Sequence, residues 1–225
     1  IAANGDGWTV SGETGDIGAR AVIVASGAAL AKLGVPGEEA FAGRGVSDCA
    51  SCDGPLLRGK VAVVVGGGDS AMQEALVVAE HAAKVVLVTD GDALHGQADY
   101  RDKVEASDKI EKRFNSTVAE IMGENGVSKV RIRDLARDAE EELDADGVFV
   151  FIGLAPSTGF LGDLLPLDGK GHIRVDAALR TPVKGIAAAG NVRAGGSFRA
   201  AGVMGDGAVA AKAVDDYLTT GEWAN

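Results

Sequence analysis

The chain has 225 residues, of which 46% are hydrophobic and 24% are charged, and its formal net charge is −11. This length suffices for one large or two smaller globular domains, and the excess of acids argues against nucleic-acid binding, which requires clustered Lys and Arg. No apolar run reaches the roughly 18 residues that cross a bilayer, and two cysteines are too few for a secreted disulfide framework. We therefore expect a cytoplasmic protein that binds neither nucleic acid nor membrane.

The first part of the chain predicts a small β-meander. Stretches rich in β-forming residues occur at 1–4, 8–11 and 19–24, with glycine-containing turns at 4–7 and 14–16. Asn-Gly between apolar runs is a strong hairpin signal. The last strand runs into Ala25, Ser26 and Gly27, small residues that either let a ligand approach the backbone or simply form a tight turn. Because Ile1 falls inside the first strand, we expect further residues upstream of it.

Both cysteines lie in a stretch at 41–57 that we expect to be mostly loop. Cys49 and Cys52 have the C-x-x-C spacing, which beside a strand–helix pattern indicates a redox-active dithiol. One thiolate of such a pair attacks a substrate disulfide and the other resolves the mixed disulfide. Zinc would need two more soft ligands, and the chain offers only three scattered histidines. The alternative is two unrelated buried thiols. Asp53 is either a proton shuttle or a turn residue.

The pattern after the cysteines predicts a strand–turn–helix–strand unit. Val61–Val65 is a β-branched run typical of a central parallel strand, residues 70–81 have helical periodicity, and 84–90 form a second buried strand. The turn between them has the glycine pattern of dinucleotide-binding proteins, in which backbone N–H groups and the helix amino end hold a pyrophosphate. The residues expected at this site are Gly66, Gly67, Gly68, Asp69, Ser70 and Ala71.

An acidic residue ends the second strand of this unit. Asp90 stands about twenty residues after the glycine turn, where a carboxylate hydrogen-bonds the adenosine ribose and repels a 2′-phosphate. The sequence therefore favours NADH over NADPH. The alternative is a solvated aspartate of a turn.

The rest of the chain predicts a second run of strands and a terminal helix. We expect a short helix at 100–106, strands at 110–114, 117–122, 127–134, 148–152 and 185–191, and a helix at 202–218. The acidic segment 138–146 is predicted to be solvated. His95 and His172 are expected at the surface.

Taken together, these motifs resemble the low-molecular-weight thioredoxin reductase family of flavin-dependent disulfide oxidoreductases. The resemblance rests on the cysteine motif, the glycine motif shortly after it, Ala25-Ser26-Gly27, Gly153 with Pro156, and Gly190-Asn191 before the terminal helix. Their order and spacing match across nearly the whole chain.

The resemblance implies an α/β fold with two Rossmann-like domains, parallel sheets and small β-meanders. An FAD-binding domain, residues 1–45 and 154–225, is interrupted by an NAD(P)-binding domain, 46–153, that carries the cysteines. It implies a homodimer that uses FAD and NAD(P)H to reduce a thioredoxin-like protein or a small disulfide. Cys52 would face the flavin, Cys49 would attack the partner disulfide, and Asp53 would donate a proton. The FAD would be lined by Ala25, Ser26, Gly27, Gly190, Asn191, Val192, Arg199, Ala200 and Ala201.

Three departures from the family pattern are visible. The glycine-rich FAD fingerprint that begins family members does not occur, so the FAD domain is expected to be incomplete at its amino end. No arginine stands at Asp90 or Gly91, where the family binds the 2′-phosphate, and Asn191 replaces the aspartate that contacts FAD. Two other functions remain open: a small-molecule dithiol oxidase or reductase that does not use nicotinamide, and a non-catalytic nucleotide-binding redox module.

Overall fold

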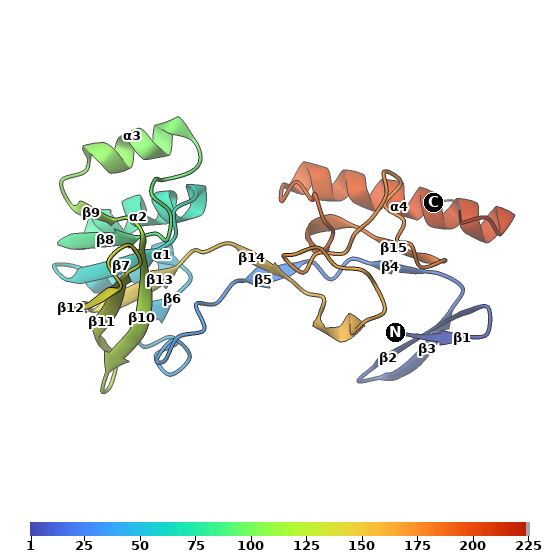
Figure 1. Cartoon of the computed structure of the whole chain (residues 1–225), viewed down its shortest axis with the longest axis horizontal. Helices are drawn as coiled ribbons and strands as arrows, with labels where there is room; N and C mark the ends of the chain where they lie inside the picture. The colour runs from blue at the N-terminus through green and yellow to red at the C-terminus, as the bar shows by residue number, and fades with distance from the viewer. Residues whose placement is uncertain (224–225) are drawn as a thin grey trace. The chain divides into compact units, whose positions relative to one another are not determined.

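A computed structural model describes residues 1–223, and within them the chain divides into two compact units (Figure 1). Residues 1–29 and the described residues from Leu154 onward form the first unit, and residues 30–153 form the second. The chain passes between the units at β5 (Ala28–Leu30) and β14 (Leu154–Pro156). No helix within 1–223 is both long and apolar enough to cross a membrane.

The second unit is built on a parallel five-stranded sheet. Alternate residues of its central strands point to opposite faces, so both faces are apolar: Ala62 and Val64 pack on one side, Val63 and Val65 on the other. Each of these valines is at most 4% exposed, and burying one contributes about 2 kcal/mol. The strand order is β6 (Val46–Ser47), β13 (Gly147–Val150), β7 (Val61–Val65), β8 (Lys84–Val88) and β9 (Ile110–Arg113).

Helices cover one face of this sheet. The helix α2 (Asp69–His81) buries Ala71, Met72, Ala75 and Val78 against β7 and β8, as its apolar spacing predicts. Its neighbours are α3 (Ala98–Ala106), the short helix α1 (Ala50–Asp53) and a 3₁₀ turn at Gly54–Leu57. The segment 41–57 was predicted to be rich in loops, and turns do occupy most of 41–49, but the two helical turns at 50–57 were not predicted because they are too short for a periodicity to be read.

An antiparallel three-stranded sheet covers the other face. It consists of β10 (Ser116–Gly123), β11 (Val127–Asp134) and β12 (Ala139–Asp144). The last of these strands lies in the acidic segment, which is exposed as predicted, but no apolar pattern marks it as a strand. Its glutamates instead pair with basic residues of β11: Arg133 with Glu140, and both Lys129 and Arg131 with Glu142. Charge complementarity across strands, rather than an apolar pattern, marks this strand.

Residues 30–45 belong to the second unit, whereas the sequence analysis placed them with the first. Phe41 is buried in the core beneath β10 and β11, and the Pro36 carbonyl accepts a hydrogen bond from the Ile121 amide. The segment 30–45 has no periodic pattern of apolar residues from which these contacts could be predicted.

The first unit combines a meander, a pair of parallel strands and a long helix (Figure 1). The meander is β1 (Ala2–Asn4), β2 (Gly7–Gly12) and β3 (Gly15–Ala19). The strand β3 falls partly where we predicted a turn, because its four leading residues are exposed and lack an apolar face. The parallel pair is β4 (Val22–Val24) and β15 (Ile186–Ala188), and α4 (Ala200–Thr220) packs on it.

Candidate functional site

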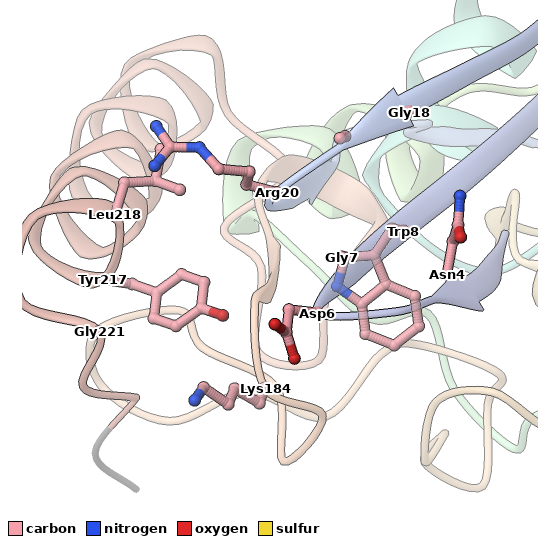
Figure 2. Close-up of a pocket in the computed structure, with 11 residues that line it drawn as sticks. Asn4, Asp6, Gly7, Trp8, Gly18, Arg20, Lys184, Tyr217, Leu218 and Gly221 are labelled. Atoms are coloured by element: carbon pink, nitrogen blue, oxygen red, sulfur yellow. The ribbon is translucent and has the colours of Figure 1, made fainter.

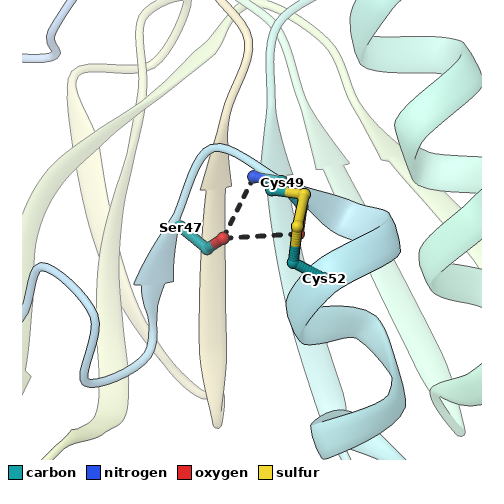
Figure 3. The surroundings of a disulfide bond; sticks show 3 residues. All are labelled: Ser47, Cys49 and Cys52. Carbon is teal, nitrogen blue, oxygen red and sulfur yellow. Dashed lines mark hydrogen bonds between the residues drawn. A yellow bond between two sulfur atoms is a disulfide. The ribbon is translucent and has the colours of Figure 1, made fainter.

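The two cysteines form a disulfide at the start of α1 in the second unit (Figure 3). Their Cα atoms are 5.3 Å apart, and Cys49 is half-buried while Cys52 is exposed. The described residues contain no free cysteine. A four-residue bridge of this kind, partly open to solvent, is accessible to thiol–disulfide exchange.

Ser47 ties the disulfide to the parallel sheet. It is the last residue of β6 and lies opposite Phe149 of β13. Its Oγ accepts a hydrogen bond from the Cys49 amide at 3.1 Å and also lies 3.5 Å from the Cys49 carbonyl oxygen (Figure 3). The bridge therefore starts from a fixed point on the sheet edge. We did not predict this role for Ser47, although a serine oxygen that accepts from the amide two residues later forms a recognised local turn.

Asp53 follows the second cysteine directly. It is half-buried and lines a cavity of about 380 Å³ together with Ser47 and Lys60. A carboxylate beside a hollow of this size has room for water.

The glycine turn between β7 and α2 has the conformation that close approach to a phosphate needs. Gly66 has φ +135°, and a Cβ there would lie 2.2 Å from the Phe151 carbonyl oxygen. A Cβ on Gly67 would lie 2.4 Å from the Thr89 hydroxyl oxygen. A Cβ on Gly68 would meet nothing within 4 Å, so the space beside it is open. Only glycine fits the first two positions, as a dinucleotide fingerprint requires.

The amino end of α2 is available to an anion. Gly68 is its N-cap, and no side chain among the described residues caps the helix there. The N–H groups of the first turn and the helix dipole therefore favour a negatively charged group beside Gly68. Ser70 and Ala71 lie in this turn as predicted, and Ala71 is fully buried against the strand. These features fit the pyrophosphate of a dinucleotide.

Acidic residues border the same edge of the sheet. Asp90 is exposed and follows Thr89 at the carboxyl end of β8, and Asp92 is exposed two residues later. No arginine lies between Gly66 and Gln97. Residues 66–97 therefore present carboxylates and no guanidinium at this edge.

In the first unit, two predicted turns lie at one edge of the parallel strand pair. Val24 pairs with Ala188, so the turn 25–27 after β4 and the turn 190–192 after β15 are neighbours. The Ala189 amide donates to the Val24 carbonyl at 3.0 Å. Ser26 Oγ donates to the Ser157 carbonyl at 2.7 Å, and Gly27 has φ +70°. Binding sites in parallel sheets form at this carboxyl edge.

Asn191 has a buried side-chain oxygen without a partner in the described structure. Gly190 before it has φ +80°, and Val192 after it is fully buried. An unsatisfied buried oxygen costs about 1–3 kcal/mol unless a ligand or water supplies a donor. This orphan oxygen fits a hydroxyl of a bound cofactor. Arg199, Ala200 and Ala201, by contrast, are exposed at the start of α4.

An ion pair that the sequence analysis missed fixes this turn. Asp206, buried on α4, accepts hydrogen bonds from the Gly190 amide at 3.0 Å and from Arg193 Nε and Nη2, each at 2.6 Å. The Arg193 hydrogen bond, with help from the Gly190 amide, holds the pKa of Asp206 below its usual value although burial opposes this. Thirteen residues separate the pair, a spacing that no local pattern signals.

His172 is buried, which corrects the expectation of a surface position. Its ring packs edge-on against Phe198, and Nδ1 lies 3.5 Å from Asp168 Oδ1. It follows a glycine turn in a polar stretch, so the sequence gives no sign of burial. His95 is exposed, as predicted.

The first unit also contains a cavity of about 520 Å³ (Figure 2). Trp8, Tyr217, Arg20 and Lys184 are among the residues that line it. Arg20 precedes β4 and Lys184 precedes β15, so the cavity lies at the amino edge of the strand pair, opposite the turns 25–27 and 190–192. It is not part of the candidate site.

The comparisons with known proteins agree with this geometry. The family model described as pyridine nucleotide-disulphide oxidoreductase matches residues 4–215. A thioredoxin reductase of Treponema pallidum is 42% identical over 207 residues, which are 92% of this chain and 67% of that protein. One from Bacillus subtilis is 41% identical over 201 residues, 89% of this chain and 64% of that protein.

A solved structure supports the same relationship. The thioredoxin reductase of Lactococcus lactis superposes with a TM-score of 0.86 at 32% identity, covering 96% of this chain and 72% of that one. The chain spans between 63% and 67% of the length of the curated relatives that it matches. By both sequence and fold, this chain belongs to the pyridine nucleotide-disulphide oxidoreductases and, among them, to the thioredoxin reductase family.

Proposed function

We propose that the protein is a flavin-dependent dithiol–disulfide oxidoreductase that passes electrons from NADH to the Cys49–Cys52 disulfide and on to a thioredoxin-like protein or a small disulfide. The observation that carries this proposal is the disulfide itself, which lies on the same unit as a glycine turn suited to a dinucleotide. Membership of the thioredoxin reductase family supports the proposal that the disulfide and the glycine turn serve one redox reaction.

Each of the two units would bind a different cofactor. Residues 25–27 and 190–192 of the first unit, with Arg199, Ala200 and Ala201, would hold FAD, and the Asn191 oxygen would accept a cofactor hydroxyl. Residues 66–71 and Asp90 of the second unit would hold the nicotinamide dinucleotide. When bound, FAD supplies the two-electron relay between nicotinamide and disulfide that side chains cannot provide.

At the dithiol, the steps balance as a two-electron exchange. Two electrons and two protons open the Cys49–Cys52 bridge to two thiols. The Cys49 thiolate then attacks the partner disulfide and forms a mixed disulfide, with one partner sulfur leaving as a thiolate. Cys52 attacks Cys49, which restores the internal bridge and releases the second partner sulfur. Asp53 would supply the proton that a leaving thiolate takes up.

The choice of NADH rests on the acidic edge beside β8. Asp90 and Asp92 would repel a 2′-phosphate, and a carboxylate at Asp90 can accept hydrogen bonds from ribose hydroxyls. The lack of arginine between Gly66 and Gln97 leaves one second candidate, a flavin-dependent dithiol oxidase or reductase that takes no electrons from nicotinamide. We also propose a homodimer in the cytoplasm, on family membership alone.

Anaerobic titration of the purified, flavin-loaded protein tests the proposal. NADH is expected to bleach the flavin absorbance and then to generate two thiols per chain, while NADPH does so at higher concentration. Bleaching by neither nucleotide would favour the second candidate. A purified protein that lacks flavin under all conditions would contradict the proposal.

The cofactor preference gives a separate prediction. Asp90→Arg should improve the ratio of kcat/KM for NADPH over NADH about fivefold, because an exposed ion pair contributes on the order of 1 kcal/mol. Steady-state kinetics with both nucleotides measures the ratio. Asp108→Arg is the matched control, since Asp108 is exposed before β9, at the opposite edge of the sheet. An unchanged ratio in Asp90→Arg would count against a site for the adenosine ribose here.

A further inference from the structure

The segment that connects β8 to α3, residues 91–97, lies against the glycine turn, and we call it the strap. Its first residue is fixed by the Asn115 amide, which donates to the Gly91 carbonyl at 2.8 Å. Leu94 in its middle is buried in the core beneath α2. The His95 amide donates to the Gly67 carbonyl at 2.8 Å, so the strap is bonded directly to the turn that would hold a pyrophosphate.

A single carboxylate fastens the far end of the strap. Asp69, in the first turn of α2, accepts a hydrogen bond from the Gln97 amide through Oδ1 at 2.7 Å and one from Gln97 Nε2 through Oδ2 at 3.2 Å. Hydrogen bonds to a charged acceptor are stronger than those between neutral groups. The carboxylate thus couples the amino end of the helix to the chain that leaves the strap.

Gly96 shows how closely the two parts fit. Its φ is +130°, and a Cβ at this position would lie 2.0 Å from Asp69 Oδ1. Any side chain there would displace the carboxylate. The contact between Asp69 and the strap therefore depends on a glycine that the sequence analysis did not single out.

We infer that Asp69 is a positioning residue, which holds the strap against the glycine turn and so forms one wall of the dinucleotide site. The inference rests on the proposed function for the identity of the ligand. From the glycine motif alone, Asp69 is expected to contact the cofactor directly. Both of its oxygens instead receive hydrogen bonds from Gln97, and a carboxylate placed directly on a pyrophosphate would repel it. Its contribution to binding would be through the strap.

The test compares two substitutions that remove the same charge. Asp69→Ala loses both hydrogen bonds, whereas Asp69→Asn keeps an oxygen that can accept from the Gln97 amide. If Asp69 acts by holding the strap in place, the Asp69→Ala variant should bind NADH with a dissociation constant raised roughly tenfold. The dissociation constant of the Asp69→Asn variant should stay near that of the wild type. If Asp69 acted only through its charge, Asn and Ala would behave alike, and that result would overturn the inference.

Binding is measured by calorimetric titration of the flavin-loaded protein with NADH, and strap order by hydrogen exchange at the amides of His95 and Gln97. Exchange should accelerate in Asp69→Ala and not in Asp69→Asn. Asp99→Ala is the matched control, because Asp99 is an exposed acid two residues beyond the strap that pairs with Lys103 on α3. It should change neither reading.

The possible failures are distinguishable. Faster exchange in Asp69→Ala with unchanged NADH affinity would show that the strap is not part of the dinucleotide site. No binding of NADH by the wild-type protein would overturn the inference as well. Tight NADH binding without transfer of electrons to Cys49–Cys52 would instead defeat the proposed function, and the effect of Asp69→Ala on affinity would still decide the role of the strap.

Discussion

Replacing Cys52 with serine is expected to abolish disulfide turnover while leaving flavin bound. The internal bridge cannot form with one sulfur, so Cys49 is left as a single thiol that has no resolving partner. The loss should be on the order of a thousandfold or more, as for other residues that act as a unit in catalysis. Flavin should remain, because the residues proposed to hold it belong to the first unit and Cys52 belongs to the second.

Three measurements check this prediction: turnover of a protein disulfide, the flavin absorbance spectrum, and a thiol count after NADH is added. Ser51→Ala is the matched control, because Ser51 is an exposed neighbour in the same helical turn. It should leave all three readings near wild type. Undiminished turnover in Cys52→Ser would remove the cysteine mechanism, while loss of flavin would show that the two units are not independent.

Replacing Asp206 with asparagine is expected to cost about 3 kcal/mol of unfolding free energy, because it leaves the Arg193 guanidinium partly buried without its counter-charge. The Gly190 amide also loses a charged acceptor, so the turn that presents Asn191 should loosen and flavin should dissociate faster. Urea unfolding and the flavin off-rate measure the two effects. Asp215→Asn is the control on the same helix, since Asp215 is exposed.

The pH dependence of this loss has a defined sign. The pKa of Asp206 is lowered in the folded protein, so its stabilising effect is present above the unfolded-state pKa of about 4 and disappears as the pH falls through the lower folded value. The difference between wild type and Asp206→Asn should therefore be full at neutral pH and shrink below about pH 4. The double variant Asp206→Leu with Arg193→Met should recover much of the stability, since replacing both partners leaves no buried charge. A difference that grows on acidification would contradict the assignment of Arg193 as partner.

The parts of the fold that could be predicted are those in which a short stretch of sequence has a recognisable pattern, such as a β-branched run, a glycine motif or apolar residues at helical spacing. The β-branched run of β7, the glycine turn and the apolar face of α2 follow one another without interruption, so their order alone predicts the unit. The strand β12 was not predicted, because its residues are mostly acidic and have no apolar alternation. Its glutamates form ion pairs with Lys129, Arg131 and Arg133 of β11, and these pairs are visible only once the strands lie side by side. The ring of His172 likewise contacts Phe198, a residue that lies far along the chain.

By itself, the sequence determined the α/β class, the cysteine pair and the glycine turn, since each of these depends on residues close together in the chain. It also determined the family, through the order and spacing of such short motifs along the chain. Only the tertiary structure decided that Asp206 and Arg193 fix the turn at Gly190 and that Asp69 fastens the strap. These contacts join residues by hydrogen bonds whose geometry depends on where strands and helices come to lie in space. The spacing along the chain carries no record of that placement.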